Sequence, residues 1–291
     1  MKIYCITNQR AGLGESPVWS KEENCVYWID ILGPSLLCTD LATQRTRVWK
    51  MPNPIGMIAL RTRGGLIVAL EDGIYSFDAS RGNLELLTHL EEACFENRPN
   101  DGKCDVKGRL WVGTMNKVDP SQATGAFYRI SPSLTIDKIN CGIRIPNGLA
   151  WSPDDSVMYH TDTRSNMVCS YNFNSAKGER SEQKDFFSFG QNKNGSVDGA
   201  AMDIEGGYWA ALYGGGKLVR IMPDGAVERE IPLPVTQPTM PAFGGMDMKT
   251  IFITTARQKL NADTLVSQDF AGGLLSLQVD VPGLPVHPFG G

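Results

Sequence analysis

Three oxygen-bearing side chains stand out because each opens a similar stretch of sequence, although they lie far apart in the chain. Glu15 begins Glu-Ser-Pro-Val-Trp, Asn147 begins Asn-Gly-Leu-Ala-Trp, and Asp198 begins Asp-Gly-Ala-Ala-Met. Two carboxylates and one amide oxygen form a hard donor set that suits Ca²⁺, Mg²⁺ or Mn²⁺, with Zn²⁺ and Fe²⁺ as alternatives. The structural alternative is a plain turn, which Asn-Gly and Asp-Gly favour when each dipeptide is taken alone.

These residues can meet only if a repeated element brings them together, and the sequence contains such a repeat. Each copy has an apolar strand, a polar turn and a second apolar strand, and a third strand follows, as at residues 73–78, 125–130 and 217–221. If Glu15, Gly56, Asp101, Asn147, Asp198 and Gly244 are equivalent starts, the spacings run from 41 to 51 residues. A period of about 45 residues with four strands per unit is typical of a propeller blade.

We therefore predict an all-β fold, with residues 1–291 forming a single six-bladed β-propeller of four-stranded blades. The strand near Ile3 precedes the first complete unit, so we expect it to pair in the last blade and close the ring. The first strand of each blade lines the central channel of a propeller, which would bring Glu15, Asn147 and Asp198 together. A β-sandwich is the competing fold, but the fixed period argues against it.

Five motifs across the chain carry a family resemblance. They lie at residues 14–19, 97–103, 108–115, 146–154 and 197–199. In this order they resemble the signatures of the SMP-30/gluconolactonase/regucalcin family, and the resemblance extends from about residue 12 to residues 271–275.

The resemblance implies a lactonase, which hydrolyses a sugar aldonolactone to the sugar acid with the help of one divalent metal ion. It implies that Glu15, Asn147 and Asp198 bind the metal, with Ca²⁺ as the first expectation. It also implies that Arg98 and Asn100 bind the substrate, and that Asp198 is the catalytic group that transfers protons.

The chain departs from the family pattern after the Gly-Thr-Met segment, where members often carry an acidic substrate contact. Here the sequence reads Asn-Lys-Val-Asp, with Val118 near the expected position and Asp119 just beyond it. Asp119 could compensate from a loop. We expect Asp101 and Lys103 to have only a supporting role.

Two other functions stay open at this stage. One is a metal-dependent propeller hydrolase that acts on phosphotriesters or xenobiotic lactones, and the other is a non-catalytic calcium-binding propeller. A serine triad is disfavoured, because the chain has no Gly-x-Ser-x-Gly motif and only three histidines, of which His160 is interpreted as structural.

Charge and composition limit the classes of partner that the protein is expected to bind. A net charge of −4 without a basic stripe argues against nucleic acid, and no apolar stretch approaches the roughly 20 residues of a membrane span. The N-terminal residues lack a signal-peptide core, so we expect a cytoplasmic protein, either a monomer or a weak homodimer, whose partner is a small sugar lactone. The seven cysteines are scattered and are expected to be reduced.

Overall fold

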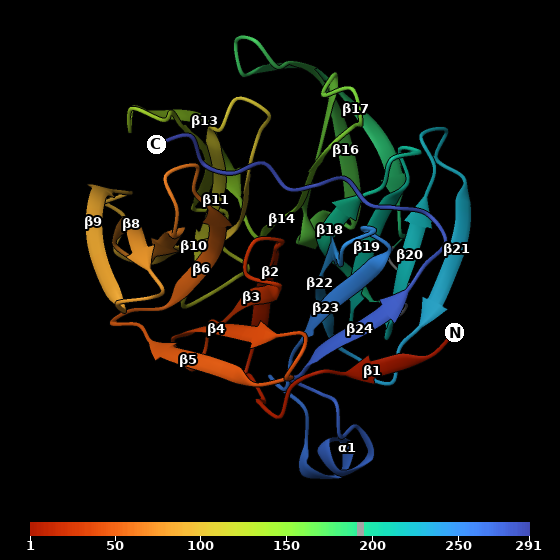
Figure 1. Ribbon diagram of the computed structural model, residues 1–291. Coiled ribbons are helices and arrows are strands. Elements are labelled where there is room, and N and C mark those ends of the chain that lie inside the picture. Colours follow the sequence, from red (N-terminus) through yellow and green to blue (C-terminus); the bar gives the residue numbers. More distant parts are fainter. Residues whose placement is uncertain (191–194) are drawn as a thin grey trace. The chain divides into compact units, whose positions relative to one another are not determined.

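The computed structural model describes residues 1–190 and 195–291, whose strands group into six antiparallel sheets of four strands each (Figure 1). These sheets are the blades of a six-bladed β-propeller, as the repeat predicts. Within each blade the strands follow one another in chain order, except where the N-terminal strand joins the last blade.

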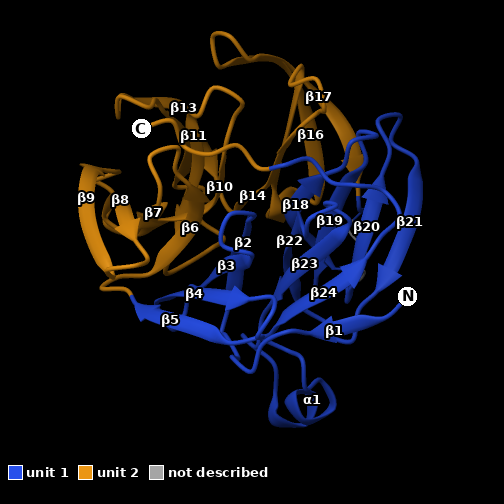
Figure 2. Cartoon of the chain, viewed as in Figure 1, with its two compact units in different colours: residues 1–50, 189–285 blue, residues 51–188, 286–291 orange. Residues whose placement is uncertain are grey.

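The chain divides into two compact units, which Figure 2 distinguishes by colour. Unit 1 comprises residues 1–50 and 189–285, and unit 2 comprises residues 51–188 and 286–291. The single domain over residues 1–291 stays a prediction.

Unit 1 holds three of the blades. The first is built from β2 (Gly14–Ser20), β3 (Cys25–Asp30), β4 (Ser35–Asp40) and β5 (Thr46–Lys50). The second is built from β18 (Ser196–Met202), β19 (Tyr208–Tyr213), β20 (Lys217–Ile221) and β21 (Val227–Pro232). The third is built from β22 (Pro238–Gly244), β23 (Thr250–Thr255), β24 (Leu274–Gln278) and β1 (Ile3–Cys5).

The predicted position of the N-terminal strand is confirmed. β1 pairs antiparallel with β24, with Ile3 opposite Leu277 and Cys5 opposite Leu275. The last blade therefore obtains its outer strand from the other end of the chain, and this covers the edge that β24 would otherwise expose.

Unit 2 holds the other three blades. The first is built from β6 (Ile55–Leu60), β7 (Leu66–Leu70), β8 (Gly73–Asp78) and β9 (Asn83–His89). The second is built from β10 (Asn97–Cys104), β11 (Leu110–Asn116), β12 (Gly125–Ile130) and β13 (Ile136–Ile143). The third is built from β14 (Pro146–Trp151), β15 (Val157–Asp162), β16 (Met167–Asn174) and β17 (Glu179–Ser188), with the short 3₁₀ helix η1 (Thr163–Ser165) between β15 and β16.

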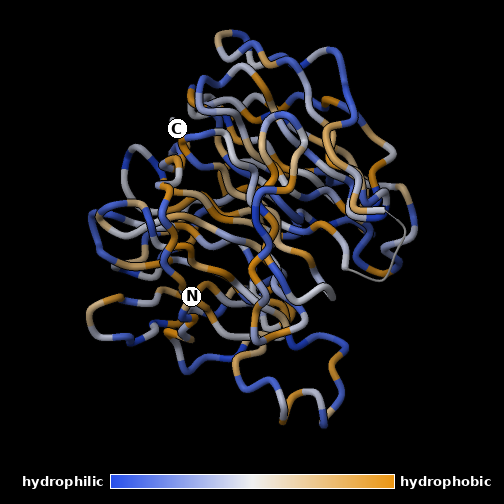
Figure 3. Tube along the Cα trace, turned by 90° about the vertical axis from the view of Figure 1, so that its right-hand side faces the viewer, coloured by the Kyte–Doolittle hydropathy of each residue, from blue (hydrophilic) through white to orange (hydrophobic). Residues whose placement is uncertain are grey.

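Burial falls from the first strand of a blade to the last. Every residue of β14 and of β22 is buried, whereas β5 and β17 consist of half-buried and exposed residues. Apolar and hydrophilic stretches accordingly alternate along the chain in Figure 3. This pattern follows from the fold, because the first strand of a blade packs on both faces and the last strand meets solvent on one side.

Two buried carboxylates belong to the framework of the blades. Asp105 accepts hydrogen bonds from Arg109 Nε at 2.7 Å and from the Trp111 indole at 2.8 Å. Asp203 likewise accepts from Arg220 Nε at 2.7 Å and from the Trp209 indole at 2.7 Å. Each carboxylate satisfies a buried indole and a buried guanidinium, so these acidic residues stabilise the turn after the first strand of their blade.

A β-bulge interrupts the first strand of each blade. In five blades two residues of this strand lie opposite a single residue of the second strand, as in β2, where Glu15 pairs with Ile29 and the next pair is Val18 with Tyr27. The same two-residue bulge occurs in β10, β14, β18 and β22. In β6 the bulge consists of one extra residue that has no counterpart in β7. Bulges re-aim side chains and are frequent next to active sites.

The bulges correct one predicted equivalence. Gly244 is the last residue of β22 and pairs with Thr250, so it does not correspond to Glu15. The residue of β22 that pairs just before the bulge is Pro238, opposite Thr255. The error arose because prolines occupy this strand start, where the other copies carry Asx-Gly or Glu-Ser signals.

One helix was not expected. α1 (Ala262–Ser267) lies between β23 and β24, and the Asn261 side chain caps it by accepting a hydrogen bond from Thr264 N at 2.8 Å. No helix in the described part of the chain has the length and apolar character needed to cross a membrane.

Candidate functional site

Three predicted site residues come together in unit 2 through one chain of hydrogen bonds. Arg98 Nη1 donates to Asn100 Oδ1 at 3.0 Å and to the Pro99 carbonyl at 2.7 Å. Asn100 Nδ2 in turn donates to Asn147 Oδ1 at 3.3 Å. Because Asn100 is the first bulge residue of β10 and Asn147 is the last paired residue before the bulge of β14, the bulges place both amides at the same end of adjoining strands.

The amide of Asn147 is held in one orientation. Its Nδ2 donates to Thr163 Oγ1 in η1 at 2.8 Å, and Asn147 as a whole is only 3% exposed. The helix η1 is itself fixed by Asp162, whose carboxylate accepts from Arg164 N at 3.1 Å. Because Thr163 binds the amide nitrogen of Asn147, the amide oxygen Oδ1 is directed toward Asn100.

Asp101 supports this arrangement from the second bulge position of β10. Its Oδ2 accepts a hydrogen bond at 3.2 Å from the backbone N of Leu149, the second bulge residue of β14. Burial raises the pKa of the Asp101 carboxyl. The supporting role expected for Asp101 therefore has a physical basis, because its side chain ties the two bulged strands to each other.

Unit 1 holds the two predicted carboxylates. Glu15 is the last paired residue before the bulge of β2, and Asp198 is the first bulge residue of β18. Tyr213, at the end of β19, pairs with Ser196, two residues before Asp198. Burial first, and then the charges of Asp198 and Glu15, raise the pKa of its phenol to about 12. The phenol is therefore harder to deprotonate than that of an ordinary tyrosine.

The backbone around Glu15 is specialised. Glu15 Oε2 accepts a hydrogen bond from Ser16 N at 2.9 Å, and Ser16 is a buried residue with a left-handed backbone at φ 48°. A non-glycine residue in this region is uncommon and tends to occur where function requires it.

The predicted metal ligands offer hard oxygen donors that fit a divalent cation of the calcium or magnesium type. Glu15 and Asp198 belong to unit 1 and Asn147 belongs to unit 2. Within the described residues, no three side chains of His, Cys, Asp or Glu gather as metal ligands, and the predicted set differs from such a group by its amide oxygen.

Comparison with known proteins identifies the family. The model of the SMP-30/gluconolactonase/LRE-like region matches residues 13–257. The chain belongs to this family. It is 36% identical over 289 residues to a 6-deoxy-6-sulfogluconolactonase of Pseudomonas putida, with 99% of both chains covered. It is 30% identical over 297 residues to regucalcin of Xenopus laevis, with 100% of this chain and 99% of the relative covered.

A solved structure agrees with this relationship. The crystal structure of regucalcin from Agrobacterium tumefaciens, described as a calcium-binding protein, superimposes with a TM-score of 0.93 at 28% sequence identity. The match covers 98% of this chain and 96% of the other.

In this SMP-30-like chain, the segment that departs from the family pattern is a loop in which Asp119 is the acidic residue. Val118 is 77% exposed. The Asp119 carboxylate accepts hydrogen bonds from Ser121 Oγ at 2.7 Å and from Gln122 Nε2 at 3.0 Å, and these bonds lower its pKa to about 2. Asp119 therefore stabilises its own loop.

Sequence reasoning missed two neighbours of the site. Tyr213 lies at the end of a second strand and Thr163 lies in a short connection, so neither belongs to a motif that marks the start of a blade. Strand pairing positions them: Thr163 follows Asp162, which pairs with Pro146, and Tyr213 pairs with Ser196.

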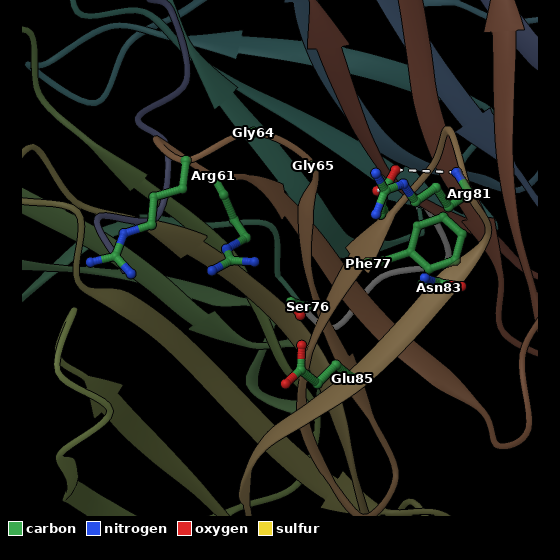
Figure 4. A pocket seen from close by; sticks show the side chains of 10 residues that line it. Arg61, Gly64, Gly65, Ser76, Phe77, Arg81, Asn83 and Glu85 are labelled. Carbon is green, nitrogen blue, oxygen red and sulfur yellow. Dashed lines mark hydrogen bonds and ion pairs between the residues drawn. The ribbon is translucent and has the colours of Figure 1, made fainter.

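A surface pocket of about 470 Å³ lies elsewhere in unit 2, on the blade of β6–β9 (Figure 4). Arg61, Arg63 and Arg81 line it together with Glu85, and Arg81 Nε pairs with Asp78 at 3.8 Å. None of the predicted site residues borders this pocket.

Proposed function

We propose that this member of the SMP-30/gluconolactonase/LRE-like family hydrolyses a sugar lactone to the corresponding sugar acid. The observation that carries the proposal is the chain of hydrogen bonds from Arg98 through Asn100 to Asn147, because it assembles polar groups suited to sugar hydroxyls at a β-bulge of a lactonase-type fold. The relative named 6-deoxy-6-sulfogluconolactonase, which aligns over nearly the whole chain, supports an aldonolactone as the substrate class.

The proposed cofactor is one divalent cation with oxygen ligands from Glu15, Asn147 and Asp198. Ca²⁺ is the first candidate, because the regucalcin of similar structure is described as calcium-binding, and Zn²⁺, Mg²⁺, Mn²⁺ and Fe²⁺ are the alternatives. When bound, such a cation polarises the lactone carbonyl as a Lewis acid and offsets the negative charge that develops on its oxygen.

The protein's own groups would handle binding and protons. The Arg98 guanidinium and the Asn100 amide would hold sugar hydroxyls and so fix the position of the lactone carbonyl. As the oxygen of a water molecule bonds to the carbonyl carbon, the Asp198 carboxylate would take the proton. The bond between this carbon and the ring oxygen then breaks, and the ring oxygen receives a proton to give the hydroxy acid.

Tyr213 would add a neutral phenol to this scheme. Its phenol keeps its proton at neutral pH, since its pKa is raised to about 12. A hydrogen bond from this hydroxyl to Asp198 or Glu15 would stabilise the ionised carboxylate, which is the form required for cation binding and for proton uptake.

A second candidate is calcium binding without catalysis, which the description of the related regucalcin structure favours. An assay of proton release from aldonolactones separates the two functions. A lactonase acidifies an unbuffered lactone solution faster than the spontaneous reaction, and a chelator stops this excess rate. A calcium binder leaves the spontaneous rate unchanged, although calcium still raises its melting temperature.

A further inference from the structure

Gln237 lies immediately before β22, in the region where the sequence analysis misplaced the start of the last blade. Its neighbour Pro238 is the last paired residue before the bulge, which is the register position that Glu15 has in β2. Gln237 is therefore one residue before that position, as Gly14 is in β2.

β22 packs between the two strands of unit 1 that carry the predicted carboxylates. On one side, Thr239 Oγ1 donates to the Gly14 carbonyl at 2.6 Å, next to Glu15. On the other side, the bulge glycine after Asp198 has no room for a side chain, because a Cβ on Gly199 would lie 2.9 Å from Cα of Met240. Gln237 thus belongs to the same end of the same three strands as Glu15 and Asp198.

The side chain of Gln237 is buried without a hydrogen-bond donor for its oxygen. Gln237 is 8% exposed. Among residues 1–190 and 195–291, no group donates a hydrogen bond to its Oε1. The backbone at this position is fixed, because the Gln237 carbonyl accepts from Ala256 N at 2.9 Å. A buried acceptor without a donor lowers the stability of the folded protein.

Other polar groups close by are satisfied within the protein. The Thr239 hydroxyl donates to the Gly14 carbonyl, and Thr255 Oγ1 donates to the Gly273 carbonyl at 2.7 Å. Gln237 Oε1 therefore differs from the hydroxyl groups of Thr239 and Thr255, which are hydrogen-bonded within the protein. Such an exception is expected where a ligand supplies the missing partner.

We propose that Gln237 Oε1 accepts a hydrogen bond from a hydroxyl group of the substrate, and that Gln237 thereby selects polyhydroxylated lactones over lactones that lack this hydroxyl. The inference rests on the proposed lactonase function and adds a residue that determines specificity. A site built to bond a hydroxyl group discriminates strongly against an analogue without it, because the polar protein group is then left unpaired.

The test combines one substitution with a series of substrates. Gln237→Met keeps the length of the side chain and removes its acceptor, and Gln237→Glu keeps an acceptor. Initial rates are measured on D-glucono-δ-lactone and on its monodeoxy analogues. Gln237→Met should lower kcat/KM about tenfold on the parent lactone, as expected for the loss of one hydrogen bond, and should have no effect on one deoxy analogue. Gln237→Glu should keep the preference of the wild type for the parent lactone over this deoxy analogue.

A matched control and a second readout complete the test. Gln278→Met, at the exposed end of β24, should change neither the rate on the parent lactone nor the rate on the deoxy analogues. The melting temperature of Gln237→Met should rise in the absence of substrate, because the unpaired buried oxygen is gone. The proposal would be overturned if Gln237→Met lost kcat/KM equally on every lactone, or if it discriminated between the parent lactone and the deoxy analogues as the wild type does.

The two proposals can fail separately. If the wild-type protein hydrolyses no lactone, the proposed function is wrong, and the melting temperature then decides the role of Gln237. A higher melting temperature of Gln237→Met would support an acceptor kept for a ligand, and an unchanged or lower one would refute it.

Discussion

Asn100 donates a hydrogen bond from Nδ2 to Oδ1 of Asn147 at 3.3 Å, across the first strands of two neighbouring blades. The contact is long for an N–H···O hydrogen bond, so Asn147 Oδ1 keeps capacity for a second, stronger partner. Thr163 already accepts from the other end of this amide at 2.8 Å. The oxygen of Asn147 is therefore oriented before any ligand arrives, as expected for a metal ligand held by a second residue.

Thr163 should act as a positioning residue for Asn147. Thr163→Val removes the acceptor for Asn147 Nδ2, so the affinity for Ca²⁺ should fall about tenfold, within the usual range for the loss of a group that orients a metal ligand. Isothermal titration calorimetry measures this change. Thr163→Ser keeps the hydroxyl and should restore the affinity, whereas equal affinity in Thr163→Val and the wild type would refute the role.

Asp198→Asn should abolish most of the lactonase activity without unfolding the protein. The amide keeps the shape of the side chain but takes no proton, so kcat should fall by roughly 10²- to 10⁴-fold, as for the loss of a general base. Asp224→Asn, in an exposed turn of the same unit where the carboxylate caps Ala226 N, is the matched control and should keep full activity. Full activity of Asp198→Asn with an unchanged circular dichroism spectrum would exclude it as the catalytic base.

Asp119 should not contribute to substrate binding. Its carboxylate is occupied by Ser121 and Gln122 within its own loop, so Asp119→Ala should leave KM for the lactone within about twofold of the wild type and cost stability only within the range typical of surface substitutions. Steady-state kinetics on both proteins checks this. A KM raised tenfold or more would show that this side chain replaces the missing acidic contact after all.

His160 should make stability depend on pH. Burial first, and then the neighbouring Arg180, lower the pKa of its imidazole to about 3. An unfolded histidine binds its proton near pH 6.5, so the stabilisation is fully present above pH 6.5 and is lost as the pH falls from there toward 3. The free energy of unfolding should decrease by about 1.4 kcal/mol per pH unit below pH 6 from this group alone.

Urea denaturation between pH 7 and pH 5 measures the dependence on His160, because few carboxylates titrate in this range. His160→Phe keeps an aromatic ring beside Phe127, whose ring centroid lies 4.5 Å from that of His160, and it should show a flatter pH profile. Identical profiles for both proteins would mean that the pKa of the imidazole is the same in the folded and unfolded states.

Much of the fold follows from the sequence. The expected strands at residues 73–78, 125–130 and 217–221 coincide with β8, β12 and β20, because glycine or a charged residue ends the preceding turn and alternating residues follow. The repeat pattern is misleading at the last blade. Pro238 and Pro241 stand where the other blades carry their motif, so the pattern places the start of the first strand at Gly244, which is in fact its last residue.

The site could be predicted only in part. Arg98, Asn100 and Asn147 lie in sequence motifs, and the structure joins them by hydrogen bonds. Tyr213 and Gln237 lie outside such motifs, and their positions depend on how strands pair and pack. The bulges could not be predicted either, because a bulge is defined by two strands and not by one.

The central claim is that Glu15, Asn147 and Asp198 bind one divalent cation on which lactone hydrolysis depends. The most direct measurement determines bound metal per chain and the rate of aldonolactone hydrolysis on the same samples of wild type, Glu15→Gln, Asn147→Leu and Asp198→Asn. We predict one ion per wild-type chain and a parallel loss of metal and activity in all three variants. Hydrolysis at the wild-type rate by metal-free protein, or an unchanged metal content in the variants, would contradict the account.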